Sequence, residues 1–205
     1  IIEVGAGTGS STHALLALLA PYGERIDYCF TDISPHFVRH AQRTLAADYP
    51  FVRCAPLDIE APITPQGFSV GQADLVLGAN VVHATKDLHV TLQNLKTLLK
   101  RGGLLLLNEI TAATPLATLT FGLLDGWWNI ADAHRRLPGA PLLNFDQWRT
   151  LLADVGMGPI HLQTLQDAGT VYHGQALFAA QSDGVLLTEA VAPPQPTADV
   201  PPPAP

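Results

Sequence analysis

The sequence predicts an α/β fold, in which a mostly parallel, seven-stranded sheet carries helices on both faces and ends in antiparallel strands. Short apolar or β-branched runs alternate with longer amphipathic segments through the first half of the chain. The run 73–79 has too few polar residues for a half-exposed strand, as expected of a buried parallel strand. Glycine clusters follow the first expected strand and precede the fifth.

The first element is a strand, a glycine turn and a helix. Ile1-Ile2-Glu3-Val4 leads into glycines at positions 5, 7 and 9, then into Ser10-Ser11-Thr12, which are helix-capping types, and a leucine-rich run. Such glycines allow a tight, partly left-handed turn and leave no side chain where a ligand approaches the backbone. The helix N-terminus adds unpaired N–H groups. We therefore expect a nucleotide-type site here; a structural turn is the alternative.

The glycine spacing discriminates between cofactors. Dinucleotide folds use G-x-G-x-x-G, whereas here the third glycine comes one residue early and Ser10 stands in that place. The pattern E-x-G-x-G-x-G resembles motif I of class I S-adenosylmethionine (SAM) methyltransferases. SAM carries an ammonium and a sulfonium, so an acid such as Glu3 suits its charge. The spacing disfavours an NAD-binding domain.

Asp32 follows a second expected strand, 25–31, and a helix is expected over 35–47. Asp32 stands where nucleotide folds hydrogen-bond the ribose diol, with a helix cap as the alternative role. A third strand, 51–54, leads to Asp58 and Ile59. An Asp can accept from the adenine amine while an apolar neighbour packs on the ring, so we expect these two residues to hold the adenine. A solvated acidic loop is the alternative.

The fourth strand, 73–79, is followed by a leucine-rich helix that Lys100-Arg101-Gly102-Gly103 would end, and 104–107 is the fifth strand. The apolar, aromatic segment 115–133 is expected to be helical with breaks at its glycines. Asn144 would cap a further helix ending at Gly156. Residues 159–166 and 172–180 are expected to form the closing antiparallel pair.

Length and composition predict one domain, 1–182, followed by a Pro/Ala-rich linker, 183–205. The chain begins inside a strand without a Met, so we expect a fragment that lacks its upstream part. Only 14% of residues are charged, which indicates a surface that other protein covers in a larger assembly.

Several classes of function are disfavoured by composition. A net charge of −7 without a Lys/Arg cluster argues against nucleic acid, and we expect no membrane partner because no membrane-length apolar run occurs. Cys29 and Cys54 are typical of buried free thiols in a reducing cytoplasm, where we place the protein. The histidines and cysteines lack metal-ligand spacing, so we expect no metal.

The candidate site follows from the fold. Open parallel sheets bind ligands beyond the carboxyl ends of their strands, and Glu3, Asp32, Asp58, His83 and Glu109 all fall at or just after such ends. A histidine is partly neutral at physiological pH, so His83 suits removal of a proton from a moderately acidic carbon or hydroxyl. Glu109 can accept from the second imidazole nitrogen. Surface or ion-pairing roles are the alternatives for both residues.

Three stretches carry a resemblance: Asn80-Val81-Val82-His83-Ala84-Thr85, the strand ending at Glu109, and Phe121-Gly122-Leu123-Leu124-Asp125-Gly126-Trp127-Trp128. Together they resemble the C-methyltransferase domain of polyketide synthases, within the Rossmann-like class I SAM methyltransferases. The resemblance implies methylation of the α-carbon of a β-ketoacyl chain on an acyl carrier protein, beside neighbouring synthase domains, with S-adenosylhomocysteine as product. It implies that His83 is the catalytic base and that Glu109 orients it. The family's N-terminal lid is absent from this sequence.

The same resemblance would place three aromatic residues along the acyl or pantetheine channel, with core packing as the alternative: Phe121, Trp127 and Trp128. The expected cofactor contacts come from the glycine turn and the strand ends: Glu3, Gly5, Ala6, Gly7, Gly9, Asp32, Ile33, Asp58, Ile59 and Asn80. Two rival functions stay open, an O- or N-methyltransferase of an assembly line and a non-catalytic pseudo-methyltransferase scaffold. The intact glycines with Glu3 and Asp32 argue against the scaffold.

Overall fold

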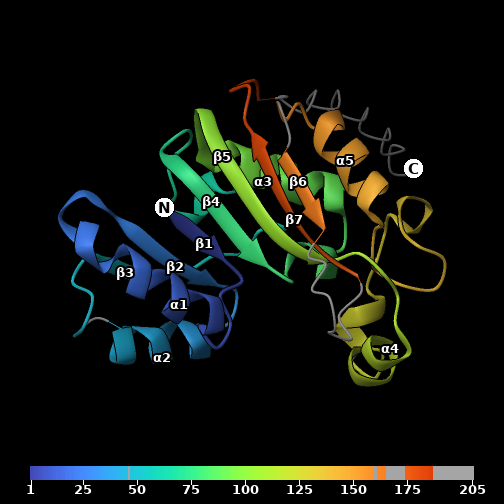
Figure 1. The fold of residues 1–205 in the computed structure, drawn as a ribbon, viewed down its shortest axis with the longest axis horizontal. Coiled ribbons are helices and arrows are strands. Elements are labelled where there is room, and N and C mark those ends of the chain that lie inside the picture. Colours follow the sequence, from blue (N-terminus) through green and yellow to red (C-terminus); the bar gives the residue numbers. More distant parts are fainter. Residues whose placement is uncertain (46, 159–160, 165–173, 187–205) are drawn as a thin grey trace, which may run out of the picture.

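A computed structural model describes residues 1–45, 47–158, 161–164 and 174–186 (Figure 1). The proline-rich part of the expected linker, 187–205, lies outside the described residues, as do parts of the two expected closing strands. Among the described residues, no helix has the length and apolar character needed to cross a membrane.

The strands form one sheet in the order β3-β2-β1-β4-β5-β7-β6. Five strands run parallel: β1 (Ile2–Val4), β2 (Tyr28–Asp32), β3 (Val52–Pro56), β4 (Ala73–Ala79) and β5 (Leu99–Ile110). β7 (Gln175–Gln181) is antiparallel to β5, and β6 (His161–Thr164) is antiparallel to β7. The predicted fold class, a mostly parallel sheet closed by antiparallel pairing, is confirmed.

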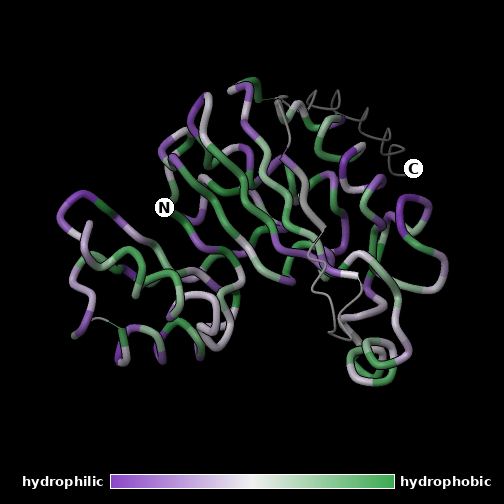
Figure 2. The backbone as a smooth tube through the Cα atoms, in the orientation of Figure 1, coloured by the Kyte–Doolittle hydropathy of each residue, from purple (hydrophilic) through white to green (hydrophobic). Residues whose placement is uncertain are grey.

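Helices cover both faces of the sheet. α1 (Ser10–Leu19) and α2 (Pro35–Leu45) pack on β2 and β3 in one buried cluster. α3 (Leu88–Leu98) and α5 (Phe145–Asp154) pack on β1, β4, β5 and β7 in a second, larger cluster. The central strands are hydrophobic along most of their length, as strands covered on both faces must be (Figure 2).

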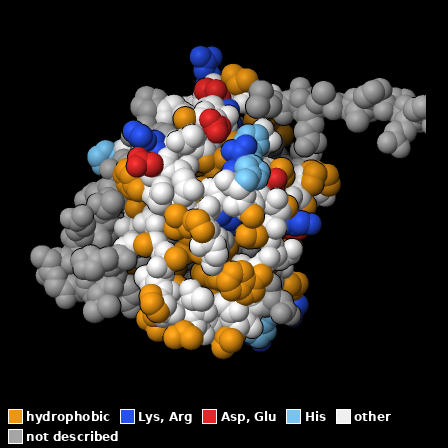
Figure 3. Space-filling model, turned by 90° about the vertical axis from the view of Figure 1, so that its right-hand side faces the viewer, with side chains coloured by type: hydrophobic (Ala, Val, Ile, Leu, Met, Phe, Trp, Pro, Cys, Tyr) orange, Lys and Arg blue, Asp and Glu red, His pale blue; other side chains and the backbone are white. Residues whose placement is uncertain are grey.

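A smaller cluster lies beyond the carboxyl end of β5. There α4 (Pro115–Phe121) and the 3₁₀ turn η4 (Asp125–Trp128) carry Ala117 and Trp127, which pack with Ala140 and Leu142. The other 3₁₀ turns are η1 (Ala20–Arg25), η2 (Thr64–Gln66), η3 (Val82–Ala84) and η5 (Ala133–Arg135). Hydrophobic side chains gather low on the face shown in Figure 3, at the height of α4 in Figure 1.

The α4–η4 segment supplies an exposed apolar surface to this end of the molecule. Its exposed large side chains are Leu116, Leu119, Phe121, Leu123, Leu124 and Trp128.

Two predicted boundaries are wrong. β5 begins at Leu99, five residues before the expected 104, because Lys100-Arg101-Gly102-Gly103 lies inside an irregular part of the strand. Leu99 pairs with Ala73, and a Cβ on Gly103 would lie 2.9 Å from the Ala73 carbonyl oxygen. The second strand begins at Tyr28 and not at 25, because η1 extends to Arg25 and the pairing of β2 with β3 starts at Tyr28.

Candidate active site

The glycine turn lies between β1 and α1, where the sequence predicts it. Gly5, Gly7 and Gly9 have φ values of +58°, +57° and +82°, a region that side chains rarely tolerate. A Cβ on Gly5 would lie 2.1 Å from Cγ2 of Val81, so this glycine is also required by packing. Gly9 is the N-cap of α1 and makes no side-chain cap, which leaves the first N–H groups of the helix for a ligand.

Asp32 joins the glycine turn to the end of β2. Its Oδ2 accepts from the backbone N–H of Gly7 at 2.8 Å, and its Oδ1 accepts from that of Ser34 at 2.8 Å. Ser34 precedes α2, so its bond to Asp32 belongs to the turn before the helix, and the bond to Gly7 shapes the predicted ligand turn. Each carboxylate oxygen has a further lone pair, so neither bond prevents Asp32 from accepting a ribose hydroxyl.

Glu3 lies beneath the glycine turn. Its side chain is buried, and Oε2 accepts from the hydroxyls of Thr12 and Tyr28, both at 2.7 Å. Burial raises the pKa of the Glu3 carboxyl above its usual value, and the two hydrogen bonds oppose this shift. Glu3 therefore links β1 to α1 and β2, so much of its hydrogen-bonding capacity serves the protein itself.

The remaining predicted cofactor residues differ in how far they are free to contact a ligand. Ile33, which follows β2, is 66% exposed, whereas Ile59 is 7% exposed and packs in the larger core cluster. Asp58 is half-buried, and its Oδ1 accepts from the backbone N–H of Glu60. Ile33 is the better placed of the two isoleucines to cover a flat apolar ring.

Ala6 lies in the glycine turn after β1, and Asn80 lies in the turn after β4. These two turns are adjacent, because Gly5 packs against Val81. The Ala6 N–H donates to the Thr31 carbonyl at 3.0 Å, which holds the glycine turn on β2. Asn80 follows β4 with a φ of +52°, and its Oδ1 accepts from Nε2 of Gln175 at 3.1 Å. A non-glycine residue in this left-handed region is a strained position of the kind found at functional sites.

His83 and Glu109 form a buried pair. Nδ1 of His83 lies 2.5 Å from Oε2 of Glu109, and both side chains are almost fully buried. The other Glu109 oxygen, Oε1, accepts from the backbone N–H groups of Val82 at 2.9 Å and Val81 at 3.2 Å. Since a carboxylate only accepts, Nδ1 donates, and the second ring nitrogen, Nε2, is left to accept a proton.

The aromatic segment reaches this pair. The Trp127 ring meets the His83 ring edge to face, with centroids 6.0 Å apart, and Phe121 stacks on Trp127 at 5.6 Å. The indole nitrogen of Trp127 is buried without a hydrogen-bond partner among the described residues. Trp128 is instead half-exposed, and its indole N–H donates to the Gly122 carbonyl at 2.8 Å. Of the three predicted channel aromatics, Trp127 therefore lies at His83, and Phe121 packs on Trp127.

An Asp132–Arg136 ion pair behind His83 was not predicted. Both side chains are buried, and Nη1 of Arg136 donates to the His83 carbonyl at 2.6 Å. The i, i+4 spacing of opposite charges is a signal for pairing, although such pairs are usually exposed. Within the described residues, no group of three or more His, Cys, Asp or Glu side chains could hold a metal ion.

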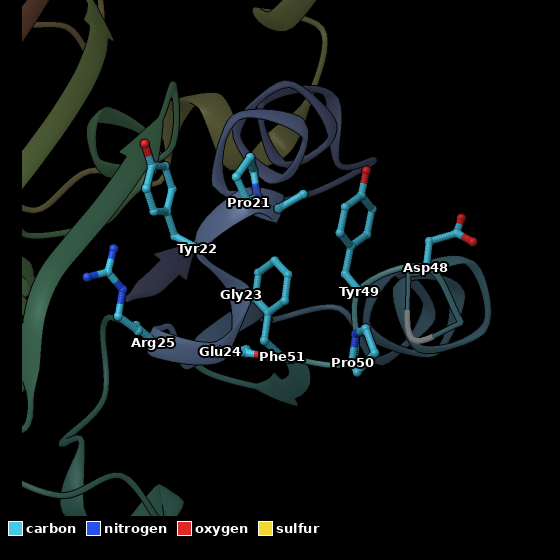
Figure 4. Close-up of a pocket in the computed structure, with 10 residues that line it drawn as sticks. Pro21, Tyr22, Gly23, Glu24, Arg25, Asp48, Tyr49, Pro50 and Phe51 are labelled. Carbon is cyan, nitrogen blue, oxygen red and sulfur yellow. The ribbon is translucent and has the colours of Figure 1, made fainter.

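A hollow of about 660 Å³ lies at the opposite end of the strands, and Figure 4 shows Tyr22, Tyr49 and Phe51 on its wall. It is formed by η1 and by residues 48–51, which precede β2 and β3. The residues described above lie at the carboxyl ends of the strands, so this hollow is separate from the candidate site.

Residues 2–105 match a family model described as a methyltransferase domain. The chain is 44% identical over 183 residues to polyketide synthase ThaQ of Burkholderia thailandensis, covering 89% of this chain and 9% of that protein. It is 40% identical over 187 residues to polyketide synthase PksR of Bacillus subtilis, covering 91% of this chain and 7% of that protein. The chain thus spans less than a tenth of these two relatives.

Solved structures of methyltransferases also match this chain. The DszA carbon methyltransferase superposes with a TM-score of 0.84 at 44% identity, over 90% of this chain and 47% of that one. The CurJ carbon methyltransferase gives 0.82 at 37% identity, over 88% and 47%. The trans-methyltransferase CalH, solved in complex with S-adenosylhomocysteine (SAH), gives 0.78 at 34% identity, over 88% and 50%.

Proposed function

The chain belongs to the methyltransferase domain family, and from this premise we propose that it transfers a methyl group from SAM to the α-carbon of a β-ketoacyl chain on an acyl carrier protein. Its similarity to polyketide synthases and to two carbon methyltransferases supports SAM-dependent methylation within such a synthase. The observation that carries the finer proposal is the buried His83–Glu109 pair. His83 follows β4, the strand beside β1 and its glycine turn, and Glu109 lies near the end of β5.

The residues at the carboxyl edge fit SAM. A Cβ on Gly7 would have no neighbour nearer than 4.0 Å, so space lies open above the turn. Asp32 retains lone pairs for the ribose hydroxyls, and the exposed Ile33 can cover the adenine. When bound, SAM supplies an electrophilic methyl group on a positively charged sulfur.

His83 is proposed as the general base. Its Nε2 would take the proton from the α-carbon, which is acidic because a ketone and a thioester flank it. Glu109 keeps the opposite nitrogen, Nδ1, protonated and stabilises the imidazolium that forms. Trp127, with Phe121 stacked on it, borders the imidazole and excludes water from this side. Positioning in a dry pocket provides the remaining rate enhancement.

The direct test incubates the protein with methyl-labelled SAM and a carrier protein loaded with a β-ketoacyl chain. Mass spectrometry should show a gain of one methylene unit, and NMR should place the label on the α-carbon. A label on oxygen or nitrogen would support the rival assembly-line methyltransferase. Absence of SAM binding by calorimetry would support the non-catalytic scaffold.

Two variants test the pair. His83→Ala should lower kcat by about 10²-fold or more, the range of general-base contributions. Glu109→Gln keeps the side-chain shape, but its amide would donate to Nδ1 and force the proton onto Nε2, so a similar loss is expected. His40→Ala, an exposed histidine on α2, is the matched control. Wild-type rates for both site variants would contradict the proposal.

A further inference from the structure

The guanidinium of Arg136 is enclosed by protein on all sides. Its side chain is 0% exposed, and it pairs with the carboxylate of Asp132. It also donates to four backbone carbonyls, those of His83 at 2.6 Å, Thr85 at 2.5 Å, Pro141 at 2.8 Å and Lys86 at 3.3 Å. Arg136 therefore contacts the backbone of the residue that carries the imidazole.

Other hydrogen bonds also join residues 131–136 to the connection between β4 and α3. Oδ2 of Asp132 accepts from the backbone N–H of Leu88, the first residue of α3, at 2.9 Å. The Ala131 N–H donates to the Lys86 carbonyl at 2.8 Å, and Nη2 of Arg136 reaches the same carbonyl at 3.3 Å. Residues 131–136 thus hold the connection between β4 and α3 at several points.

Arginine suits this place for a geometric reason. The guanidinium is planar, and its five N–H groups diverge in a fixed fork, so one side chain can satisfy several carbonyls and a carboxylate at once. A lysine ammonium at the end of a flexible chain cannot reproduce that fork. The partnership with Asp132 balances the charge, so the pair adds a fixed hydrogen-bond geometry near His83 with little net charge.

The connection held by Arg136 has little internal structure of its own. His83 is in η3, a single 3₁₀ turn, and the imidazole must keep a 2.5 Å hydrogen bond to Glu109. The carboxylate fixes the ring from one side, and Arg136 fixes the backbone of the same residue from the other. Trp127, from the chain segment just before Asp132, also contacts the His83 ring.

We propose that Arg136 is a positioning residue for His83, which holds its backbone so that the imidazole stays aligned on Glu109. The proposal rests on the base role proposed for His83. It also links the aromatic segment of residues 121–128 to the base, because residues 131–136 continue that segment.

The experiment compares four variants of the same protein. Arg136→Met removes the guanidinium, and Arg136→Lys keeps the charge without the fork. The double variant Asp132→Asn/Arg136→Met avoids an unpaired buried carboxylate and keeps an acceptor for the Leu88 N–H. Arg135→Met is the control, since Arg135 is adjacent, partly exposed and paired with Asp154 at 3.7 Å.

Two kinds of readout are needed. Steady-state kinetics give kcat and KM for the carrier-bound substrate, and calorimetry gives SAM affinity. NMR of histidine labelled with ¹⁵N detects the His83 Nδ1–H proton, which a short bond to a carboxylate shifts strongly downfield; its absence from His83→Ala assigns it. This signal needs no turnover, so it reports on alignment even if the proposed function is wrong.

We expect the double variant to fold, to bind SAM within about twofold of wild type and to lose about 10- to 100-fold in kcat, as misplaced catalytic groups do. Its Nδ1–H signal should move or disappear, Arg136→Lys should be intermediate, and Arg135→Met should match wild type. A double variant with the wild-type signal and kcat would overturn the proposal. So would a double variant that does not fold, because Arg136 would then serve the whole fold. If the wild type transfers no methyl group but its Nδ1–H signal depends on Arg136, the base role of His83 is refuted and the positioning role of Arg136 stands.

Discussion

The variant Gly5→Ala tests whether the glycine turn packs directly against the β4–α3 connection, which carries His83. At Gly5, with φ +58°, an added Cβ would lie 2.1 Å from Cγ2 and 2.8 Å from Cβ of Val81. Gly7 has nearly the same φ, +57°, but the nearest atom to its added Cβ is 4.0 Å away. Alanine at both positions meets the same backbone strain, and only at Gly5 does it also meet Val81.

The magnitudes follow from these two effects. Left-handed backbone costs a non-glycine residue about 1–2 kcal/mol. An overlap as short as 2.1 Å forces Val81 or the turn to move, and overpacking of this kind costs about 1–3 kcal/mol more. We therefore expect Gly7→Ala to lower the free energy of unfolding by about 1–2 kcal/mol and Gly5→Ala by about 2–5 kcal/mol.

Urea denaturation without cofactor measures both losses, with Gly67→Ala as a control for backbone strain without a packing overlap. Gly67 has φ +86° and no neighbour within 4 Å of an added Cβ. The backbone N–H of Val81 donates to Glu109, so Gly5→Ala should also reduce kcat in turnover assays. Equal stability losses for Gly5→Ala and Gly7→Ala, within about 0.5 kcal/mol, would refute the packing argument.

Two further predictions use the buried titratable groups. Because folding raises the pKa of Glu3 above 4.5, its contribution to stability is complete below pH 4.5 and is lost as the pH rises through the raised pKa. The unfolding free energy of wild type should thus fall relative to that of Glu3→Gln from pH 4.5 upward, as measured by urea denaturation; parallel pH curves would contradict this. Burial raises the pKa of Cys29 to about 11 and also raises that of Cys54, which is less buried. Iodoacetamide at neutral pH should therefore label Cys54 faster than Cys29 in the folded protein. Mass spectrometry after digestion measures both labelling rates, and faster labelling of Cys29 would contradict the prediction.

The alternation of strands and helices could be predicted because it depends on local periodicity. The amphipathic α2 and the leucine-rich α3 are visible within single windows of sequence. The start of β5 could not be predicted in this way. Lys100-Arg101-Gly102-Gly103 has the composition of a turn, and its strand character comes from pairing with the distant Ala73 and Ser182.

The site could be predicted where strand ends determine it. His83 follows β4 and Glu109 lies near the end of the neighbouring parallel strand β5, so the topology alone brings them to one edge. Arg136 could not be found by the same argument, because its principal acceptors are backbone carbonyls, which every residue has. The hydrogen bonds from Thr12 and Tyr28 to Glu3 could not be predicted either, because they depend on how α1 packs against β2.

The bonds from Arg136 to the carbonyls of His83, Thr85 and Lys86 have a consequence for engineering. A chimera that takes residues 111–143 from a related protein would set a foreign arginine on native carbonyls. Donor and recipient would then need matching geometry across the new junction. Crossover points before Asn80 and after Leu143 would transfer both partners together.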